Sequence, residues 1–135
     1  RLIMLRTRRM FDQNLRLRDS ASGAVTSSGS ATAIAFPATE MYEYKAVINV
    51  VAVDVTTGDE AYTFNIQVSD SSGGTYTTVG QRVIAAGQAA IATYEIPLSG
   101  YAAESILSGA DYIRVSHVLA GTTPSVNYNC WLSPM

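Results

Sequence analysis

The side chains that most often carry out chemistry in proteins are sparse in this sequence. His117 is the only histidine, so neither a histidine-based catalytic triad nor a multi-histidine zinc site can form within one chain. It lies in an apolar, strand-like segment, which favours a structural histidine over a pH sensor. Cys130 is the only cysteine, which excludes an intramolecular disulfide. Its alternating neighbours favour a small buried residue over a nucleophile.

Acidic side chains lie near the ends of the strongest strand-like segments, where they offer oxygen ligands for calcium: Asp54, Asp59, Glu60 and Asp70. Their spacing does not match an EF-hand loop, and acidic side chains at exposed turns are usually solvated. We therefore predict no metal site, and the sequence carries no motif for any other cofactor.

An enzymatic function is also disfavoured. Carboxylates paired for glycoside hydrolysis are defined by proximity in space, and only Asp54 and Glu95 lie within apolar runs. The glycine-rich segment 71–74 lacks the lysine and the following helix of a phosphate-binding loop. We expect a protein that is not an enzyme.

Charge is divided unevenly along the chain. Residues 1–18 hold six arginines and one aspartate, a net charge of +5, whereas residues 19–135 hold three basic and ten acidic residues, a net charge of −7. A basic arm on an acidic body indicates contact with an acidic protein surface or a neighbouring copy. The candidate contact residues are Arg6, Arg8, Arg9, Arg16 and Arg18.

Nucleic acid and membranes are the less favoured partners of this arm. The acidic body would repel phosphates, and Phe11 is the only aromatic residue of the arm that is available for base stacking. No apolar run approaches the roughly 18 residues that a transmembrane helix needs. We expect neither nucleic acid nor membrane as a partner.

Tyrosine is frequent, with eight copies, and only 15% of the residues are charged. Tyrosine suits surfaces that become buried in a contact, although sheet propensity alone also explains its frequency. A small β domain with so little charge risks association through its edges unless an assembly covers them. We select three residues as candidate interface aromatics: Tyr42, Tyr44 and Trp131.

Two valine- and isoleucine-rich runs dominate the strand pattern. Segment 45–55 is largely apolar on both faces, which predicts a central strand of a two-sheet sandwich. Segment 62–69 alternates strictly, with Tyr62, Phe64, Ile66 and Val68 on the buried face. A turn at 56–60 joins the two runs, and we predict that they pair as a hairpin over 44–70.

Shorter strands and glycine turns fill the rest of the chain. The predicted strands cover residues 10–18, 31–36, 75–79, 80–85, 89–96, 111–119 and 125–132, and residues 101–107 are predicted to hold one helical turn. The sequence therefore predicts an all-β, antiparallel, jelly-roll-like β-sandwich with a basic extended N-terminal arm. Residues 1–18 are the arm leading into the first strand, and residues 19–135 are one domain.

Three segments together resemble the capsid cement (decoration) proteins of tailed bacteriophages. The first is Met10–Asp19 with its Thr/Ala/Ser-rich continuation, the second is Ala61–Gly80, and the third is Asp111–Thr122 with its closing strand. The resemblance consists of strand and turn types across most of residues 10–135. Residues 1–9 lie outside it.

The resemblance implies a viral structural protein without a cofactor, located on the outer surface of a mature phage capsid. Such a protein binds the major capsid protein, forms a homo-oligomer, commonly a trimer, and stabilises the head against internal DNA pressure. Two alternatives remain open. One is a carbohydrate-binding or receptor-binding β-sandwich module, and the other is a different virion part, such as a tail or head-fibre piece.

Overall fold

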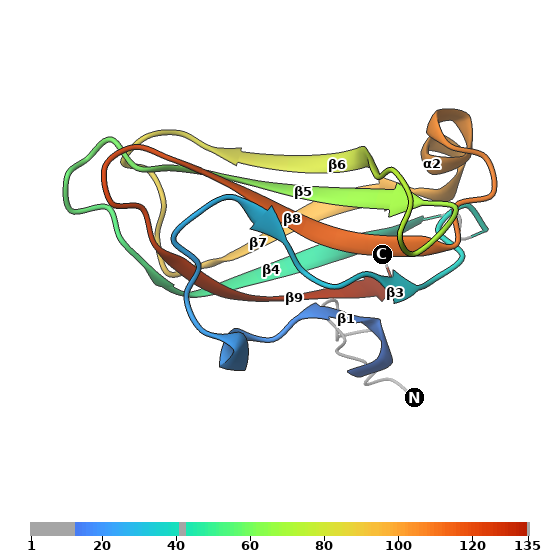
Figure 1. Cartoon of the computed structure of the whole chain (residues 1–135), viewed down its shortest axis with the longest axis horizontal. Helices are drawn as coiled ribbons and strands as arrows, with labels where there is room; N and C mark the ends of the chain where they lie inside the picture. Colours follow the sequence, from blue (N-terminus) through green and yellow to red (C-terminus); the bar gives the residue numbers. More distant parts are fainter. Residues whose placement is uncertain (1–12, 41–42, 135) are drawn as a thin grey trace.

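Two antiparallel β-sheets pack face to face and form the fold (Figure 1). The computed structural model describes residues 13–40 and 43–134. One sheet has the order β1 (Arg16–Arg18), β9 (Val126–Pro134), β4 (Glu43–Val53) and β7 (Thr93–Ser99). The other has the order β2 (Gly29–Ser30), β8 (Tyr112–Ala120), β5 (Ala61–Ser69) and β6 (Thr77–Ile84), and β3 (Ile34–Ala35) also pairs with β8. The predicted all-β antiparallel sandwich is confirmed.

The strand pairs are nested along the chain. β5 pairs with β6, β4 pairs with β7 outside them, β2 and β3 pair with β8, and β1 pairs with β9 as the outermost pair. Further pairing of β4 with β9 and of β5 with β8 joins these nested pairs into the two sheets. A long nested hairpin that is folded over into two sheets is the winding of a jelly roll, in agreement with the predicted fold.

The predicted hairpin over 44–70 is wrong, although both of its strands exist. β4 lies between β9 and β7 in one sheet, whereas β5 lies between β8 and β6 in the other. Each strand buries the side chains of one face. Two such faces form a core when they oppose each other, and this requires the strands to lie in different sheets. The connection 54–60 is long enough to cross the roughly 10 Å between packed sheets, so it does not close a tight hairpin turn.

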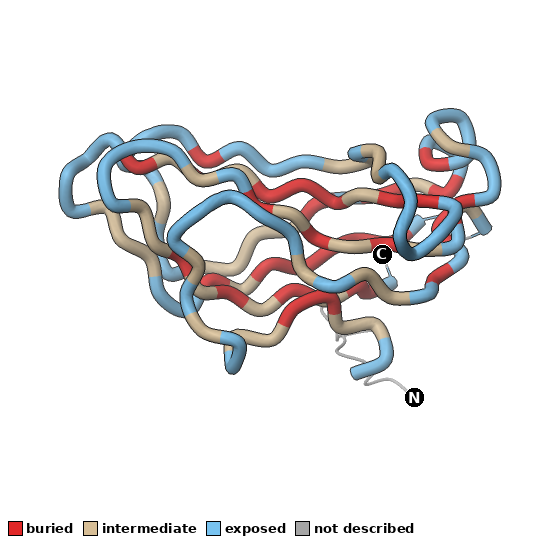
Figure 2. The backbone as a smooth tube through the Cα atoms, in the orientation of Figure 1, coloured by how far each residue is buried: buried red, intermediate tan, exposed pale blue. Residues whose placement is uncertain are grey.

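The core lies between the sheets and follows the predicted alternation. Tyr62, Phe64, Ile66 and Val68 of β5 are all at most 1% exposed, as are Tyr44 and Ile48 of β4. Figure 2 shows this buried centre running along both layers, with exposed residues concentrated in the connecting loops. The prediction of a buried face on segment 62–69 and of a central strand at 45–55 is therefore confirmed.

The remaining predicted strands differ mainly in their bounds. Strands β8 and β9 match the segments 111–119 and 125–132 closely. In the described part of segment 10–18, a 3₁₀ turn η1 (Gln13–Leu15) precedes β1, so the strand is shorter than expected. The helical turn predicted at 101–107 is α2 (Gly100–Ile106), where the Ser99 side chain caps the helix by accepting from the Ala102 amide.

Segments 75–79 and 80–85, predicted as separate strands, form the single strand β6. The pairing register shifts opposite the β5 residues Ile66 and Gln67, which is a β-bulge, and Gly80 lies at that point. A Cβ atom at Gly80 would lie 2.5 Å from Leu98 Cδ2 and 2.8 Å from Ile96 Cγ2, both on β7 of the opposite sheet. Glycine is thus required here because the two sheets approach closely, whereas the sequence pattern alone favours a break at this position.

This close approach predicts that Gly80→Ala destabilises the fold through overpacking. We expect the free energy of unfolding in urea to fall by about 1–3 kcal/mol. The matched control is Gly73→Ala, because a Cβ atom there has open space around it. The control should change stability by at most about 0.5 kcal/mol, and equal effects of the two substitutions would contradict the described packing of β6 against β7.

Candidate functional site

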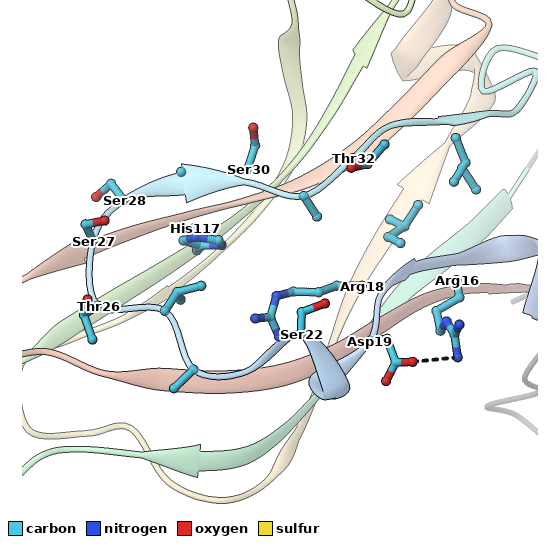
Figure 3. Close-up of a pocket in the computed structure, with 16 residues that line it drawn as sticks. Arg16, Arg18, Asp19, Ser22, Thr26, Ser27, Ser28, Ser30, Thr32 and His117 are labelled. Carbon is cyan, nitrogen blue, oxygen red and sulfur yellow. Dashed lines mark ion pairs between the residues drawn. The ribbon is translucent and has the colours of Figure 1, made fainter.

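A groove of about 700 Å³ opens along one side of the sandwich (Figure 3). It lies between β1, an edge strand of one sheet, and the segment 19–34, which contains β2 at the edge of the other sheet. Six of its lining residues carry hydroxyl groups: Ser22, Thr26, Ser27, Ser28, Ser30 and Thr32. Arg16, Arg18, Asp19 and His117 supply its titratable groups. The sequence analysis did not predict this groove.

The Ser/Gly/Ala-rich composition of segment 19–34 explains why it lies over the edge without forming a long strand. Asp19 caps the short 3₁₀ turn η2 (Ser20–Ser22) by accepting from the Ala21 amide, and Gly23 ends the turn with a φ of 91°. Val25 then makes an isolated bridge to Val126, and β2 pairs with β8. Small residues with strong turn preferences thus give a segment that touches both sheets.

Arg18 is buried and makes its contacts within the chain, so it is not the exposed contact residue that the composition of the arm predicted. Its side chain is buried, and its guanidinium donates to the Asn127 side chain and to the backbone carbonyls of Tyr128 and Gly23. The guanidinium also lies 4.4 Å from the centre of the Tyr128 ring. The prediction failed because the alternation around β1 is irregular, with a register shift between Arg16 and Arg18 that turns Arg18 inward.

Arg16 is the predicted contact residue that stays accessible in the described part of the arm. Its guanidinium lies 3.2 Å from the Asp19 carboxylate, and its side chain is 32% exposed. Such an exposed ion pair contributes little to stability and leaves the arginine able to exchange partners. Arg6, Arg8, Arg9 and Tyr42 lie outside the described residues.

Tyr44 belongs to the core, which corrects its prediction as an interface aromatic. It is 1% exposed, its hydroxyl donates to the Ala38 carbonyl at 3.1 Å, and its ring packs edge-on against Phe36. Burial raises the pKa of Tyr44 to about 12. A tyrosine within an apolar run is equally consistent with either location, so its frequency alone did not distinguish them.

Trp131 keeps its place as a candidate contact residue. The neighbouring β9 residues Cys130 and Leu132 are buried in the core, so the alternation of the strand directs Trp131 to the outer face of its sheet. It is half-buried there, and it pairs in register with Arg16 of β1. We call Arg16 and Trp131 the β1–β9 surface. It combines a cation and an aromatic side chain, the two residue types that are most enriched at interface hot spots.

His117 is buried beneath the groove, in the arrangement expected of a structural histidine. Its Nδ1 lies 2.8 Å from the Tyr128 hydroxyl. Burial, together with the nearby charge of Arg18, lowers the pKa of His117, so the imidazole is neutral at pH 7. Burial likewise raises the pKa values of Tyr128 and of the Cys130 thiol well above their usual ranges, and Cys130 is therefore a neutral core thiol.

The acidic residues considered as calcium ligands mainly stabilise turns. Glu60 accepts from the Thr57 hydroxyl and from the amides of Thr57 and Gly58, and Asp59 accepts from the amide and hydroxyl of Thr122. These hydrogen bonds lower the pKa values of both carboxyl groups. They hold the connection 54–60 against the loop before β9. Within residues 13–40 and 43–134, no group of three His, Cys, Asp or Glu side chains is arranged to hold a metal ion.

The outer face of the second sheet carries a row of paired polar side chains. Gln81 donates to Asn65 at 2.8 Å, and the Arg114 Nε donates to Gln67 at 2.8 Å. The Arg114 guanidinium stacks 3.9 Å from the centre of the Tyr76 ring. This face therefore carries hydrogen-bonded polar pairs and a Tyr76 ring covered by Arg114, but Val83 and Val118, which flank Thr63, are exposed on it.

No known protein-family model and no curated protein sequence matches this chain. Among the described residues, no helix is both long and apolar enough to cross a membrane.

The contrast between the two arginines of β1 predicts a large difference in stability. Arg18→Gln removes the buried donors of two backbone carbonyls and should lower the free energy of unfolding by about 2–4 kcal/mol. Arg16→Gln is the matched control, because its ion pair is exposed, and it should cost at most about 0.5 kcal/mol. Urea unfolding measures both values. A cost for Arg18→Gln as small as that of the control would contradict its structural role.

The lowered pKa of Glu60 predicts a pH-dependent contribution to stability. A carboxylate whose pKa is lower in the folded state stabilises the protein above its unfolded pKa, about 4.3, and loses that contribution as the pH falls through the folded pKa. The stability difference between the wild type and Glu60→Gln should therefore be largest near pH 7 and shrink below about pH 4.5. Thermal unfolding across pH 3–7 measures it, with exposed Glu43→Gln as the control. A difference that is constant with pH would refute this role of Glu60.

Proposed function

We propose that this protein is a capsid cement protein, which binds the outer surface of a mature phage head and stabilises it against the pressure of the packaged DNA. The observation that carries the proposal is where the three resembling segments lie in the fold. Segment 61–80 contributes β5 and the first half of β6, and segment 111–122 contributes β8, so these two segments build adjacent strands of one sheet. Segment 10–19 contributes β1 at the open edge of the other sheet. The resemblance therefore covers a connected part of the sandwich.

The winding of the chain supports the same proposal at the level of the fold. Jelly rolls are common among viral capsid proteins, but they are also common among lectins. The fold therefore favours both the cement function and the carbohydrate-binding alternative, and the surface has to distinguish them.

The exposed surface favours protein contact over sugar binding. Sugar-binding sandwiches stack sugars on exposed aromatic rings, yet in the described part of the chain Tyr101 is the only exposed aromatic residue. Tyr76 and Tyr94 lie beneath the guanidinium groups of Arg114 and Arg82. The β1–β9 surface instead pairs a half-buried tryptophan with a partly exposed arginine that can exchange its Asp19 partner, which fits a protein partner with an acidic surface.

The proposed mechanism is stabilisation by linkage. A cement protein that binds the assembled shell but not its separated subunits shifts the equilibrium toward the shell by its binding free energy. Several weak contacts from one homo-oligomer, for which we propose a trimer, add up because each contact raises the effective concentration for the next. The basic segment 1–18 and the β1–β9 surface are the proposed contacts to the major capsid protein or to a neighbouring copy.

Co-sedimentation with heads that lack the protein tests this proposal. We expect binding to saturate at many copies per head, because every equivalent multivalent site of the capsid lattice should be filled. Binding of only a handful of copies would favour a tail or head-fibre part, and an absence of binding would contradict a capsid function.

The basic arm gives the binding experiment a second readout. Replacing Arg6, Arg8 and Arg9 by alanine should weaken head binding roughly tenfold at low salt and flatten its salt dependence, because exposed charge contacts are screened by ions. The charge control is Arg82→Ala combined with Arg114→Ala, since both residues lie on the second sheet. An equal loss in the control would show that net charge matters more than the arm.

A glycan array tests the carbohydrate alternative. A binding signal that Trp131→Ala abolishes would support that alternative and weigh against the cement proposal. We expect no such signal, because Trp131 shares its surface with Arg16 in an arrangement suited to a protein contact.

A further inference from the structure

Arg18 is a buried cation without an acidic partner among the described residues. Its side chain is 7% exposed, and the three oxygens it contacts belong to an amide side chain and two backbone carbonyls. The nearest acid in sequence, Asp19, pairs with Arg16 instead. Buried charges are normally paired, because removing a charge from water is costly. The Tyr128 ring offsets part of that cost but supplies no negative charge.

The Arg18 guanidinium retains hydrogen-bond donors on the side of the groove. A guanidinium has five N–H groups, and the contacts to Asn127, Tyr128 and Gly23 use both of those on one terminal nitrogen and one on the other. The Nε–H and one terminal N–H remain. Figure 3 shows the guanidinium lying within the groove, between His117 and Ser22. Two adjacent N–H groups form the fork that binds a carboxylate.

His117 supplies a further donor to the same place. The Tyr128 hydroxyl lies 2.8 Å from His117 Nδ1, and in the tautomer in which the hydroxyl donates to Nδ1 the imidazole proton is on Nε2, which is the form that the proposal below uses. This Nε2 faces β2, because a Cβ atom built at Gly29 would lie 3.6 Å from it. Gly29 places no side chain against this ring edge, and His117, although only 5% exposed, lines the groove. Serine and threonine residues of segment 19–34 also line the groove, and Figure 3 shows Ser22 next to the Arg18 guanidinium.

We propose that the groove, whose lining is rich in serine and threonine, is a binding site for a carboxylate, held by the Arg18 guanidinium and His117 Nε2–H. A single negative charge fits best, because Arg16 and Asp19 neutralise each other and leave Arg18 as the net charge of the groove. A dianionic phosphate carries two negative charges, one more than the single positive charge of the groove can neutralise. The groove, at about 700 Å³, has the size of small-molecule sites and also admits an acidic side chain of a partner protein.

Because His117 is the only histidine, its ring resonances report on this site alone. Acetate, glucuronate and a blocked peptide with one glutamate should each shift the His117 imidazole signals saturably in NMR titrations of the full chain. A bound carboxylate should also raise the pKa of His117, because it offsets the charge of Arg18, which within residues 13–40 and 43–134 is the charged group that acts on the ring. Tyr128, the hydrogen-bond partner of the ring, is neutral. Equal affinities would assign a free organic acid as the ligand, and tighter peptide binding would assign a partner's side chain.

Two variants test the site without depending on the capsid proposal. Gly29→Val places a side chain over His117 Nε2 at an ordinary contact distance, in an edge strand that tolerates valine, and should reduce affinity at least tenfold. Arg18→Lys keeps the charge but removes the fork, and it should reduce affinity similarly. Arg114→Gln is the control and should bind as the wild type does.

Three outcomes would overturn the proposal. The first is an absence of any saturable His117 shift with all three carboxylate probes. The second is an unchanged affinity in Gly29→Val, because this variant leaves Arg18 and its structural contacts in place. The third is tighter binding of inorganic phosphate than of the carboxylates, which would contradict the assignment of a singly charged ligand.

Discussion

Tyr128 is the side chain that connects the two sheets to each other and to the edge strand β1. It lies on β9 in one sheet and is completely buried, with its ring 4.8 Å from that of Phe64 on β5 of the other sheet. Its hydroxyl binds His117 on β8, while Arg18 of β1 stacks on its ring and donates to its carbonyl. One residue thereby ties strands β1, β5, β8 and β9 together, and it fixes the groups that form the floor of the groove.

The nested pairing of the strands explains why the groove exists at all. The outermost pairs, β1 with β9 and β2 with β8, form the edges of the two sheets on the same side of the sandwich. The segment that joins β1 to β2 must cross that open side, and its small polar residues leave it lying over the edge instead of filling it. Exposed edges usually invite association with other chains. A protein that works in an assembly can use the same edge as a contact.

The sequence predicted the local structure well and the pairing of strands less well. Strict alternation in segment 62–69 identified β5 and its buried face, because a period of two is a local property. The strands that pair with β4 could not be predicted in the same way. β5 follows β4 in the sequence, which favoured a hairpin, but the buried faces of the two strands oppose each other, so β5 lies in the other sheet. Arg18 and Tyr44 were misjudged because neither residue type fixes its location: a register shift in β1 turns Arg18 inward, and Tyr44 shares the buried face of β4 with Ile48. The groove was missed because its lining comes from irregular chain.

The cement proposal joins these features into one account, in which a charge-poor jelly roll is held on a capsid by a basic segment and a neighbouring cation–tryptophan surface. The measurement that tests it most directly is the temperature at which DNA-filled heads release their DNA, followed as the protein is added. The account predicts that this temperature rises with added protein and levels off once the sites on the head are filled, because binding is linked to the intact shell. A release temperature that stays constant while the heads carry bound protein would contradict it.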